Sequence, residues 1–286
     1  MATWNFSSET QTLDEQARLN APGSFVKLTD GFTHYELSGP EDGQVVVLIH
    51  GFSVPYFVWD ATFAPLVEAG LRVLRYDLFG RGWSDRPDTR YDHTLFTRQL
   101  NDLITTLGIT SPVDLVGLSM GGAITATFNA RQPDRVRRIV LIDPAGFRMK
   151  KSVVMRLLSL PWLGEWLLDR FGDPVLVYGQ QADFLEPQKA NEYLEKYKDQ
   201  MRLRGFKRAI LSTLRCRVIE DAEEEFHMMH LQPKPVLLIW GKQDTTVPFR
   251  TSQRALQIIP NAEFHPIDNA RHVPHIERPE SVNPIL

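Results

Sequence analysis

Short runs of hydrophobic residues recur along the chain, and stretches with the spacing of amphipathic helices lie between them. Continuous hydrophobic runs are typical of strands buried on both faces, as in a parallel sheet covered by helices. The clearest runs are Gln44–Ile49, Leu71–Tyr76, Val113–Val116, Val136–Ile142 and Val236–Trp240. Helix-like stretches include Thr94–Leu107 and Met120–Arg131. Strands that alternate with helices predict the α/β fold class.

The sheet is expected to open with a hairpin. Two β-like runs, Phe25–Thr29 and Phe32–Ser38, flank the dipeptide Asp30-Gly31. Asp-Gly between two such runs is a strong signal for a tight turn between antiparallel strands. We therefore expect antiparallel strands at the start of a mostly parallel sheet.

The alternation of strands and helices stops between about residues 148 and 230. This stretch predicts helices alone, over Ser152–Phe171, Gln188–Leu203 and Phe206–Cys216. An uninterrupted helical stretch between two predicted strands indicates an insertion. The sequence therefore predicts a core domain formed by residues 1–147 and 231–286, with residues 148–230 as a helical cap.

The first part of this insertion is unusually rich in leucine and tryptophan, including Trp162 and Trp166. An amphipathic helix pair that packs on the core accounts for this composition. Side chains of this kind also suit the wall of an apolar acyl-binding pocket. The sequence leaves both interpretations open, and Trp162 and Trp166 are candidate pocket residues.

A Gly-x-Ser-x-Gly motif joins a predicted strand to a predicted helix at Gly117-Leu118-Ser119-Met120-Gly121. In this context the serine is expected at the apex of a sharp, strained turn that projects its hydroxyl away from the sheet. Glycines two positions to either side avoid clashes that a β-carbon would cause. The alternative, a loop serine in a glycine-rich turn, does not explain the flanking strand and helix. Ser119 is the candidate nucleophile.

A serine nucleophile needs a general base, and the chain has eight histidines. Ligands of α/β sheets bind outside the carboxyl ends of the strands. The run Glu263–Ile267 predicts the final strand, and His272 lies in the loop that leaves it. We therefore predict His272 as the base, whereas His275 fits a structural position on a helical turn.

The acid that orients the base is expected beyond another strand end. Asp244 follows the predicted strand Val236–Trp240 by four residues. Asp143 and Asp268 also follow predicted strands, but turn formation and helix capping explain both positions. Asp244 is the candidate acid, with the other two as rivals.

Two backbone amides are candidates for an oxyanion hole. The predicted strand Gln44–Ile49 ends in His50-Gly51-Phe52, where Gly51 permits a tight turn that can aim the Phe52 amide at the site. The Met120 amide lies at the start of the helix after Ser119, where the positive end of the helix dipole favours an oxyanion. His50 precedes the turn and is expected to hold this loop in place.

These motifs together resemble the α/β-hydrolase superfamily over nearly the whole chain. The resemblance rests on HGF at 50–52, DLFGRGWSDRP at 77–87, GLSMGG at 117–122, WGKQDTTVP at 240–248 and ARHVPHIERPE at 270–280. The order Ser119, Asp244, His272 along the chain is also that of the superfamily. The resemblance implies the α/β-hydrolase fold, with an eight-stranded, mostly parallel sheet, helices on both faces and a helical cap after the sixth strand.

The resemblance is greatest to capped serine esterases, monoacylglycerol lipases and carbon–carbon bond hydrolases. It implies a serine hydrolase that cleaves carboxylic esters of largely apolar acyl groups through an acyl-enzyme. Ser119 argues against the relatives that use an aspartate nucleophile, the epoxide hydrolases and haloalkane dehalogenases. Diketone-type carbon–carbon hydrolases tend to carry a tryptophan where Val273-Pro274-His275 stands here. That class, the perhydrolases and slow-turnover receptors of the same fold remain alternatives.

Composition restricts the classes of binding partner and cofactor that the chain is expected to have. The formal net charge of −3 gives no electrostatic case for nucleic acid or an anionic membrane surface. A single cysteine, Cys216, permits no intrachain disulfide and no cysteine-based metal site, and the implied chemistry needs neither metal nor organic cofactor. No hydrophobic run reaches the roughly 18 residues of a transmembrane span, and the N-terminus lacks a signal-peptide pattern. A cytoplasmic protein with a small-molecule ester substrate is expected.

Overall fold

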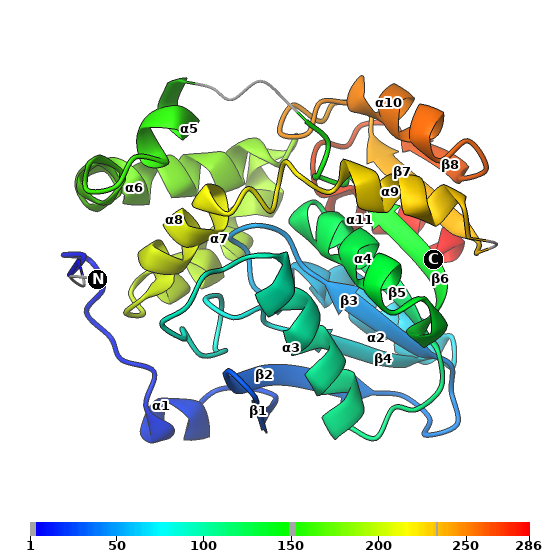
Figure 1. The fold of residues 1–286 in the computed structure, drawn as a ribbon, viewed down its shortest axis with the longest axis horizontal. Helices are drawn as coiled ribbons and strands as arrows, with labels where there is room; N and C mark the ends of the chain where they lie inside the picture. The colour runs from blue at the N-terminus through cyan, green and yellow to red at the C-terminus, as the bar shows by residue number, and fades with distance from the viewer. Residues whose placement is uncertain (1–3, 149–152, 233) are drawn as a thin grey trace.

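The computed structural model describes residues 4–148, 153–232 and 234–286. Within them, eight strands form one sheet in the order β1-β2-β4-β3-β5-β6-β7-β8 (Figure 1). The strands are β1 (Ser24–Leu28), β2 (Gly31–Ser38), β3 (Val45–Ile49), β4 (Arg72–Tyr76), β5 (Val113–Leu118), β6 (Val136–Ile142), β7 (Val236–Gly241) and β8 (Glu263–Ile267). Every strand predicted from a hydrophobic run is present.

The sheet is parallel except at its first edge. Strand β2 pairs antiparallel with both β1 and β4, and the remaining neighbours pair in parallel. The predicted hairpin is present, but its turn residues are Thr29 and Asp30, because Leu28 already pairs with Gly31. The strand order and these pairing directions confirm the predicted α/β-hydrolase fold.

Helices cover both faces of the sheet, which explains why the strands are hydrophobic throughout. In β3, Val46 and Leu48 pack on one side, while Val47 and Ile49 pack on the other. The second side is covered by α3 (His93–Thr106), α4 (Met120–Arg131), α9 (Glu223–His230) and α10 (Thr251–Ile258). The first side is covered by α2 (Asp60–Glu68), α11 (Pro274–Glu277) and α12 (Pro279–Val282). Short segments complete the chain: α1 (Glu15–Leu19) and the 3-10 turns Tyr56–Trp59, Pro133–Arg135 and Asn283–Ile285.

Four helices of the predicted insertion form a separate layer at one end of the sheet (Figure 1). They are α5 (Val153–Leu158), α6 (Leu163–Ala182), α7 (Pro187–Met201) and α8 (Phe206–Arg215). We call these four helices the cap. They share a hydrophobic cluster of their own that includes Leu168, Tyr197 and Phe206.

The structure corrects two expectations about the insertion. The helix expected over Ser152–Phe171 is two helices: the chain breaks at Pro161-Trp162, where Trp162 has a left-handed φ of 65°, and α6 then continues past Pro174 to Ala182. Ser152 itself lies outside the described residues. Helix α9 falls within the predicted cap but packs with the core, where the ring of Phe226 stacks on Phe147 at 4.7 Å. The division at residues 148 and 230 stays a prediction.

The N-terminal segment lies along the cap rather than along the sheet. Gln11 forms an isolated β-bridge with Leu203, and the Glu9 carboxylate accepts hydrogen bonds from the Gly205 and Lys207 amides at 2.7 and 2.6 Å. Phe6 joins the hydrophobic cluster of the cap. Among the described helices, none combines the length and hydropathy needed to cross a bilayer.

Candidate active site

Ser119 stands at the turn between β5 and α4. Its backbone has a left-handed φ of 53°, which a serine adopts only under constraint. The turn is tight enough that a β-carbon at Gly117 would collide with the backbone of Gly121, and one at Gly121 with the carbonyl of Ile49. The predicted glycine requirement of the motif therefore has a direct steric cause, and the Ser119 side chain borders a cavity.

His272 and Asp244 meet beside this cavity. They come from the loops that follow β8 and β7, and the Nδ1 atom of His272 lies 2.8 Å from Oδ2 of Asp244. The other carboxylate oxygen of Asp244 accepts hydrogen bonds from the amides of Thr246 and Val247 at 2.8 and 3.1 Å. Asp244 is thus fixed in orientation, and it fixes one ring nitrogen of a histidine that borders the same cavity as Ser119.

A second carboxyl from the cap acts on His272. Asp183 ends α6, its carbonyl accepts a hydrogen bond from the His272 amide at 3.1 Å, and its side chain accepts one from the Thr246 hydroxyl at 2.5 Å. Burial by itself lowers the pKa of His272, but the charges of Asp244 and Asp183 outweigh it and raise that pKa to about 9. Burial raises the pKa of Asp183. Sequence analysis missed Asp183, because its role depends on a contact across 89 positions of the chain.

The structure separates Asp244 from its two rivals. The Asp143 carboxyl lies close to Asp244 and accepts a hydrogen bond from the Gly241 amide at 2.9 Å. Burial and the Asp244 charge raise the pKa of Asp143 well above its usual range. Asp268 is exposed and pairs with Lys242 at 2.8 Å. Of the three, Asp244 contacts His272.

Asp143, Asp244 and His272 are also close enough to present three ligand atoms to one metal ion, within 4.8 Å of one another. The contacts that they already make favour a hydrogen-bonded cluster instead. Both oxygens of Asp244 accept hydrogen bonds, and burial beside Asp244 raises the pKa of Asp143, which disfavours the anionic form that a metal ion needs. A cation here would have to compete with the His272 contact.

The loop after β3 brings Phe52 to the cavity. A β-carbon at Gly51 would lie 3.4 Å from that of Ser119, so the loop approaches the serine closely. In the described part of the chain, the Phe52 and Met120 amides donate to no protein acceptor. Their role as oxyanion donors stays a prediction.

His50 holds this loop, as its position in the sequence suggested. Its Nε2 accepts a hydrogen bond from the Leu78 amide at 2.8 Å, and its Nδ1 lies 2.9 Å from the Gly51 carbonyl. Burial lowers the pKa of His50 to about 4, so the ring is neutral and accepts as well as donates. Arg81 adds a hydrogen bond of 2.8 Å to the Phe52 carbonyl.

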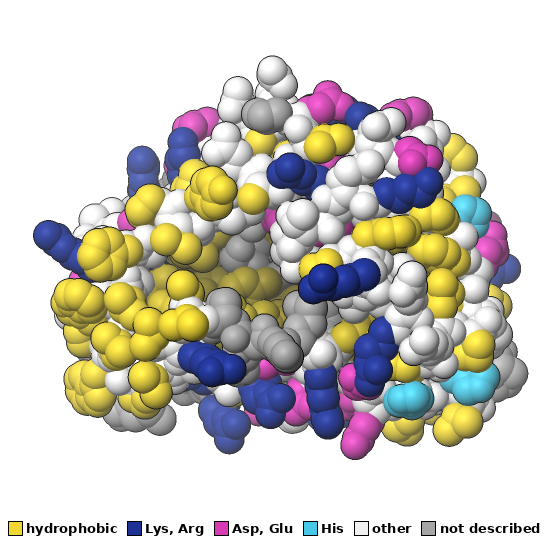
Figure 2. All heavy atoms as spheres, turned by 90° about the horizontal axis from the view of Figure 1, so that it is seen from above, with side chains coloured by type: hydrophobic (Ala, Val, Ile, Leu, Met, Phe, Trp, Pro, Cys, Tyr) yellow, Lys and Arg dark blue, Asp and Glu magenta, His cyan; other side chains and the backbone are white. Residues whose placement is uncertain are grey.

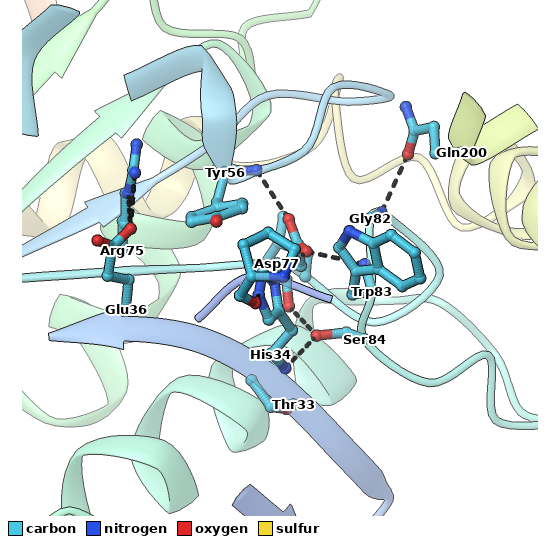
Figure 3. A network of polar contacts seen from close by, with 12 residues as sticks. Thr33, His34, Glu36, Tyr56, Arg75, Asp77, Gly82, Trp83, Ser84 and Gln200 are labelled. Carbon is cyan, nitrogen blue, oxygen red and sulfur yellow. Dashed lines mark hydrogen bonds and ion pairs between the residues drawn. The ribbon is translucent and has the colours of Figure 1, made fainter. Parts of the chain in front are cut away.

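A buried network centred on Asp77 braces the same loop from behind (Figure 3). One Asp77 carboxylate oxygen accepts the Tyr56 amide at 2.7 Å, and the other accepts the Trp83 amide at 2.8 Å and lies 2.7 Å from Nδ1 of His34. Ser84 donates to the Asp77 carbonyl at 2.6 Å. We call Asp77 and these four contacts the Asp77 network. The sequence offered only the motif at 77–87 as a signal for it.

The cavity at Ser119 has a volume of about 390 Å³. On the cap side, Val175 and Leu176 form an apolar wall, and Tyr193 donates to Gln180 at 2.6 Å beside it. Among the described residues that line it, none is a lysine or arginine, and Asp183 supplies a carboxyl. A larger cavity of about 550 Å³ lies between the N-terminal segment and α7, apart from Ser119.

Trp162 and Trp166 do not line either cavity. Their side chains are on the outer surface of the cap, with exposed fractions of 65% and 50%. Both tryptophans lie at the start of α6, whereas Val175 and Leu176, which line the cavity, come later in that helix. The residues of α6 that line the cavity, Val175 and Leu176, follow the stretch for which the sequence left a pocket role open.

Residues 46–285 match the sequence model of the alpha/beta hydrolase family. The chain belongs to this family. Curated relatives of this hydrolase include an AB hydrolase superfamily protein, YfhM, of Bacillus subtilis, 26% identical over 90% of this chain and 94% of the relative. A 2-hydroxymuconate semialdehyde hydrolase of Pseudomonas putida is 29% identical over 73% of each chain.

Solved structures of varied activity share the fold of this hydrolase. An enol-lactonase from Burkholderia xenovorans LB400 superposes with a TM-score of 0.78 at 22% identity, covering 92% of this chain and 97% of that one. A thermophilic esterase from Thermogutta terrifontis gives 0.78 at 23% identity, covering 92% and 96%. Likeness at this identity establishes the fold, and the site must distinguish between activities.

Proposed function

We propose that this hydrolase cleaves neutral carboxylic esters with largely apolar acyl groups, using Ser119, His272 and Asp244. The observation that carries the proposal is the 2.8 Å contact between His272 and Asp244 at a cavity that the strained Ser119 turn also borders. The apolar wall of Val175 and Leu176 suits an acyl chain. The sequence resemblance to serine esterases agrees with this chemistry.

In this mechanism the Ser119 oxygen attacks the ester carbonyl carbon while His272 takes the hydroxyl proton. The carbonyl oxygen becomes an oxyanion, which the Phe52 and Met120 amides stabilise because neither has another partner to give up. His272 then gives its proton to the leaving alkoxide, and an acyl-Ser119 ester remains. Water repeats the two steps, releasing the carboxylic acid and restoring the serine. Asp244 fixes the imidazole tautomer and stabilises the imidazolium throughout.

Carbon–carbon bond cleavage is the main rival, since one relative is a 2-hydroxymuconate semialdehyde hydrolase. A muconate is a carboxylate at neutral pH, and a buried anion needs a cationic or strongly donating partner. The described residues that line the cavity include no lysine or arginine, and they present the Asp183 carboxyl instead. A lining without a cationic side chain favours neutral esters over anionic substrates.

Active-site labelling tests the proposed nucleophile. A fluorophosphonate should label one equivalent of protein at Ser119, and Ser119→Ala should lower kcat for nitrophenyl butyrate by about 10⁴-fold or more. Ser53→Ala is the matched control, because Ser53 lines the same cavity without a triad partner, and it should retain labelling. Labelling at any other serine contradicts the assignment.

Substrate competition tests the reaction class. Nitrophenyl and monoacylglycerol esters should turn over at about 1 s⁻¹ or faster, as in an ordinary enzyme, and 2-hydroxymuconate semialdehyde should turn over far more slowly. The reverse preference would make carbon–carbon cleavage the activity. A single burst followed by silence on every ester would indicate a binding protein.

A further inference from the structure

Large hydrophobic side chains on the surface of the cap gather on one stretch. Of the exposed large hydrophobic residues in the described chain, ten lie between Val153 and Tyr178 and three lie elsewhere. Those used below are Val153, Trp162, Phe171, Val175 and Tyr178, with exposed fractions of 71%, 65%, 52%, 54% and 71%. Exposed hydrophobic residues are ordinarily scattered singly, so a cluster marks a surface that something covers. We call the outward side of α5, the turn after it and α6 the α5–α6 face.

The α5–α6 face is the outward side of helices whose inward side is already packed. Leu168 and Gly172 of α6 are buried against the cap. Phe171, Val175 and Tyr178 recur at the three- and four-residue spacing that places them along one side of the helix. Because the inward side has its own core, the exposed side chains are not needed to hold the cap together.

Charge is distributed unequally between the two sides. The three carboxylates of α6 are all engaged by other parts of the protein: Glu165 with Arg215 at 2.6 Å, Asp169 with the Ser7 amide at 2.7 Å, and Asp173 with Lys207 at 2.7 Å. The cations behave differently. Within the described residues, Arg156 of α5 and Arg170 of α6 are exposed and have no carboxylate partner. The α5–α6 face is therefore apolar and cationic, with no free carboxylate of its own helices.

This face is continuous with the catalytic cavity. Val175 is half-exposed on the outer surface and also lines the cavity at Ser119, as do Leu176 and Gly179 in the next turn. Figure 2 shows hydrophobic side chains gathered at one side of the molecule, beside a hollow. If another apolar surface covered the α5–α6 face, a hydrophobic molecule could pass from that surface along Val175 into the cavity without crossing water.

We propose that the α5–α6 face docks this hydrolase onto an anionic lipid bilayer. Aromatic and aliphatic side chains enter the headgroup region, and Arg156 and Arg170 meet lipid phosphates. Trp162 and Tyr178 suit that depth, since their rings combine an apolar body with a polar edge. The formal net charge of −3 describes the whole chain, whereas the α5–α6 face presents Arg156 and Arg170 without a free carboxylate of its own helices.

A second copy of the chain fits this face less well. A two-fold interface would set the face against itself, bringing Arg156 and Arg170 of each copy to a surface whose helices offer no free carboxylate. An anionic headgroup layer supplies the negative charge that the face lacks. The difference in charge therefore decides between the two occupants.

Cosedimentation tests the docking surface, using phosphatidylcholine vesicles with and without about 30% phosphatidylglycerol. Wild-type protein should bind the anionic vesicles, and high salt should weaken binding by screening. Phe171→Glu should lower partitioning at least about tenfold. Arg170→Glu should lower it roughly twentyfold on anionic vesicles and little on neutral ones, since each charge near the surface is worth about fivefold.

Leu231→Glu is the matched control, because Leu231 is 80% exposed at the end of α9, outside the α5–α6 face. It should leave vesicle binding unchanged. Phe171→Glu, Arg170→Glu and Leu231→Glu should all keep wild-type rates on soluble nitrophenyl butyrate. Tryptophan fluorescence gives a second readout: vesicles should shift it to the blue, and Trp162→Phe should reduce that shift. The binding arms use no substrate, so they stand or fall separately from the esterase proposal.

Three outcomes overturn the proposal. Wild-type protein does not bind anionic vesicles, or Leu231→Glu weakens binding as much as Phe171→Glu. In the third outcome, sedimentation velocity finds a wild-type dimer that Phe171→Glu converts to monomer while vesicles have no effect, and the face is then a contact between copies.

Discussion

The Asp77 network and the α5–α6 face both depart from the usual distribution of polar and apolar groups. The network buries charged and polar groups, whereas the face exposes apolar ones. At Asp77, a fully buried carboxylate and a buried histidine are surrounded by hydrogen-bond donors. On the α5–α6 face, tryptophan, phenylalanine and tyrosine side chains stand in water although the cap has a packed core. Each departure costs free energy. The Asp77 network holds Tyr56, which follows the cavity-lining loop of Phe52, and Val175 of the α5–α6 face lines the catalytic cavity itself.

The two departures contribute different things to the site. A buried carboxylate is tolerable only when its oxygens are satisfied, so the Asp77 network holds the loop of Phe52 in a single position. An exposed apolar side chain imposes no such geometry and becomes favourable only when another surface covers it. The Asp77 network thus fixes the loop beside the catalytic cavity, whereas the apolar side chains of the α5–α6 face remain without a covering surface.

The largest expected effect concerns the buried carboxylates at the triad. Asp244→Asn should lower kcat by about 10³ to 10⁴-fold, because the imidazole loses the partner that fixes its tautomer. Asp143→Asn should cost far less, since the contact with His272 is made by Asp244 and an amide oxygen can still accept from the Gly241 amide. Steady-state kinetics of the purified variants measures both. A larger loss in Asp143→Asn would transfer the role of acid to the loop after β6.

The next effect concerns stability in the Asp77 network. Asp77→Ala leaves the Tyr56 and Trp83 amides buried without acceptors, and it should lower the free energy of unfolding by about 3 to 5 kcal/mol. Chemical denaturation measures the change. Asp268→Ala is the control, because its exposed pair with Lys242 should contribute less than about 1 kcal/mol. Equal losses would mean that the network does not brace the loop.

A pH profile probes the contact between cap and triad. The raised pKa of His272, about 9, means that the neutral base becomes more abundant as pH rises toward that value, so kcat/KM should increase through the same range. Asp183→Asn removes a negative charge that raises this pKa but keeps an acceptor for Thr246. The rise in kcat/KM should therefore move to lower pH.

The control for this profile is Asp268→Asn, which removes a carboxylate that makes no contact with His272. It should leave the midpoint of the rise where it is in the wild-type protein. An unmoved midpoint in Asp183→Asn would show that the charge of Asp183 does not reach the base.

The smallest expected effect is on the α5–α6 face itself. Phe171→Ser should change the free energy of unfolding by less than about 0.5 kcal/mol, because the side chain has few neighbours to lose. Phe226→Ala, which leaves a cavity on the buried side of α9, should lower the free energy of unfolding by about 3 to 5 kcal/mol. Thermal or denaturant melts in lipid-free buffer compare the two. If Phe171→Ser lowered the free energy of unfolding as much as Phe226→Ala does, the α5–α6 face would be packed in solution rather than exposed.

The sequence predicted what depends on local pattern. The strands and the turn at Ser119 follow from hydrophobic runs and glycine spacing, which act over a few residues. The sequence favoured Asp244 but left Asp143 as a rival, because both follow neighbouring strands, and it is the contact with His272 that distinguishes them. The contact of Asp183 with the triad was missed for the same reason.

The cap shows the limit of composition. A leucine- and tryptophan-rich helix has an inward and an outward side, and the residues alone do not say which side carries the tryptophans. One helix ends before Pro161 and α6 begins at Leu163, and within this arrangement Trp162 and Trp166 are exposed while Val175 reaches the cavity. The assignment of pocket residues thus depended on where one helix ended and the next began.

The contacts of the N-terminal segment with the cap have a consequence for the folding of the chain. The hydrogen bonds of Glu9 to Gly205 and Lys207 span 196 and 198 positions, so the loop that they close contains most of the chain. Contacts of such high order form late and slow the search for the native state. During synthesis the segment that carries Glu9 emerges long before its partners do. Seating of the cap is therefore expected as a late event in folding, after the strands that it covers have assembled.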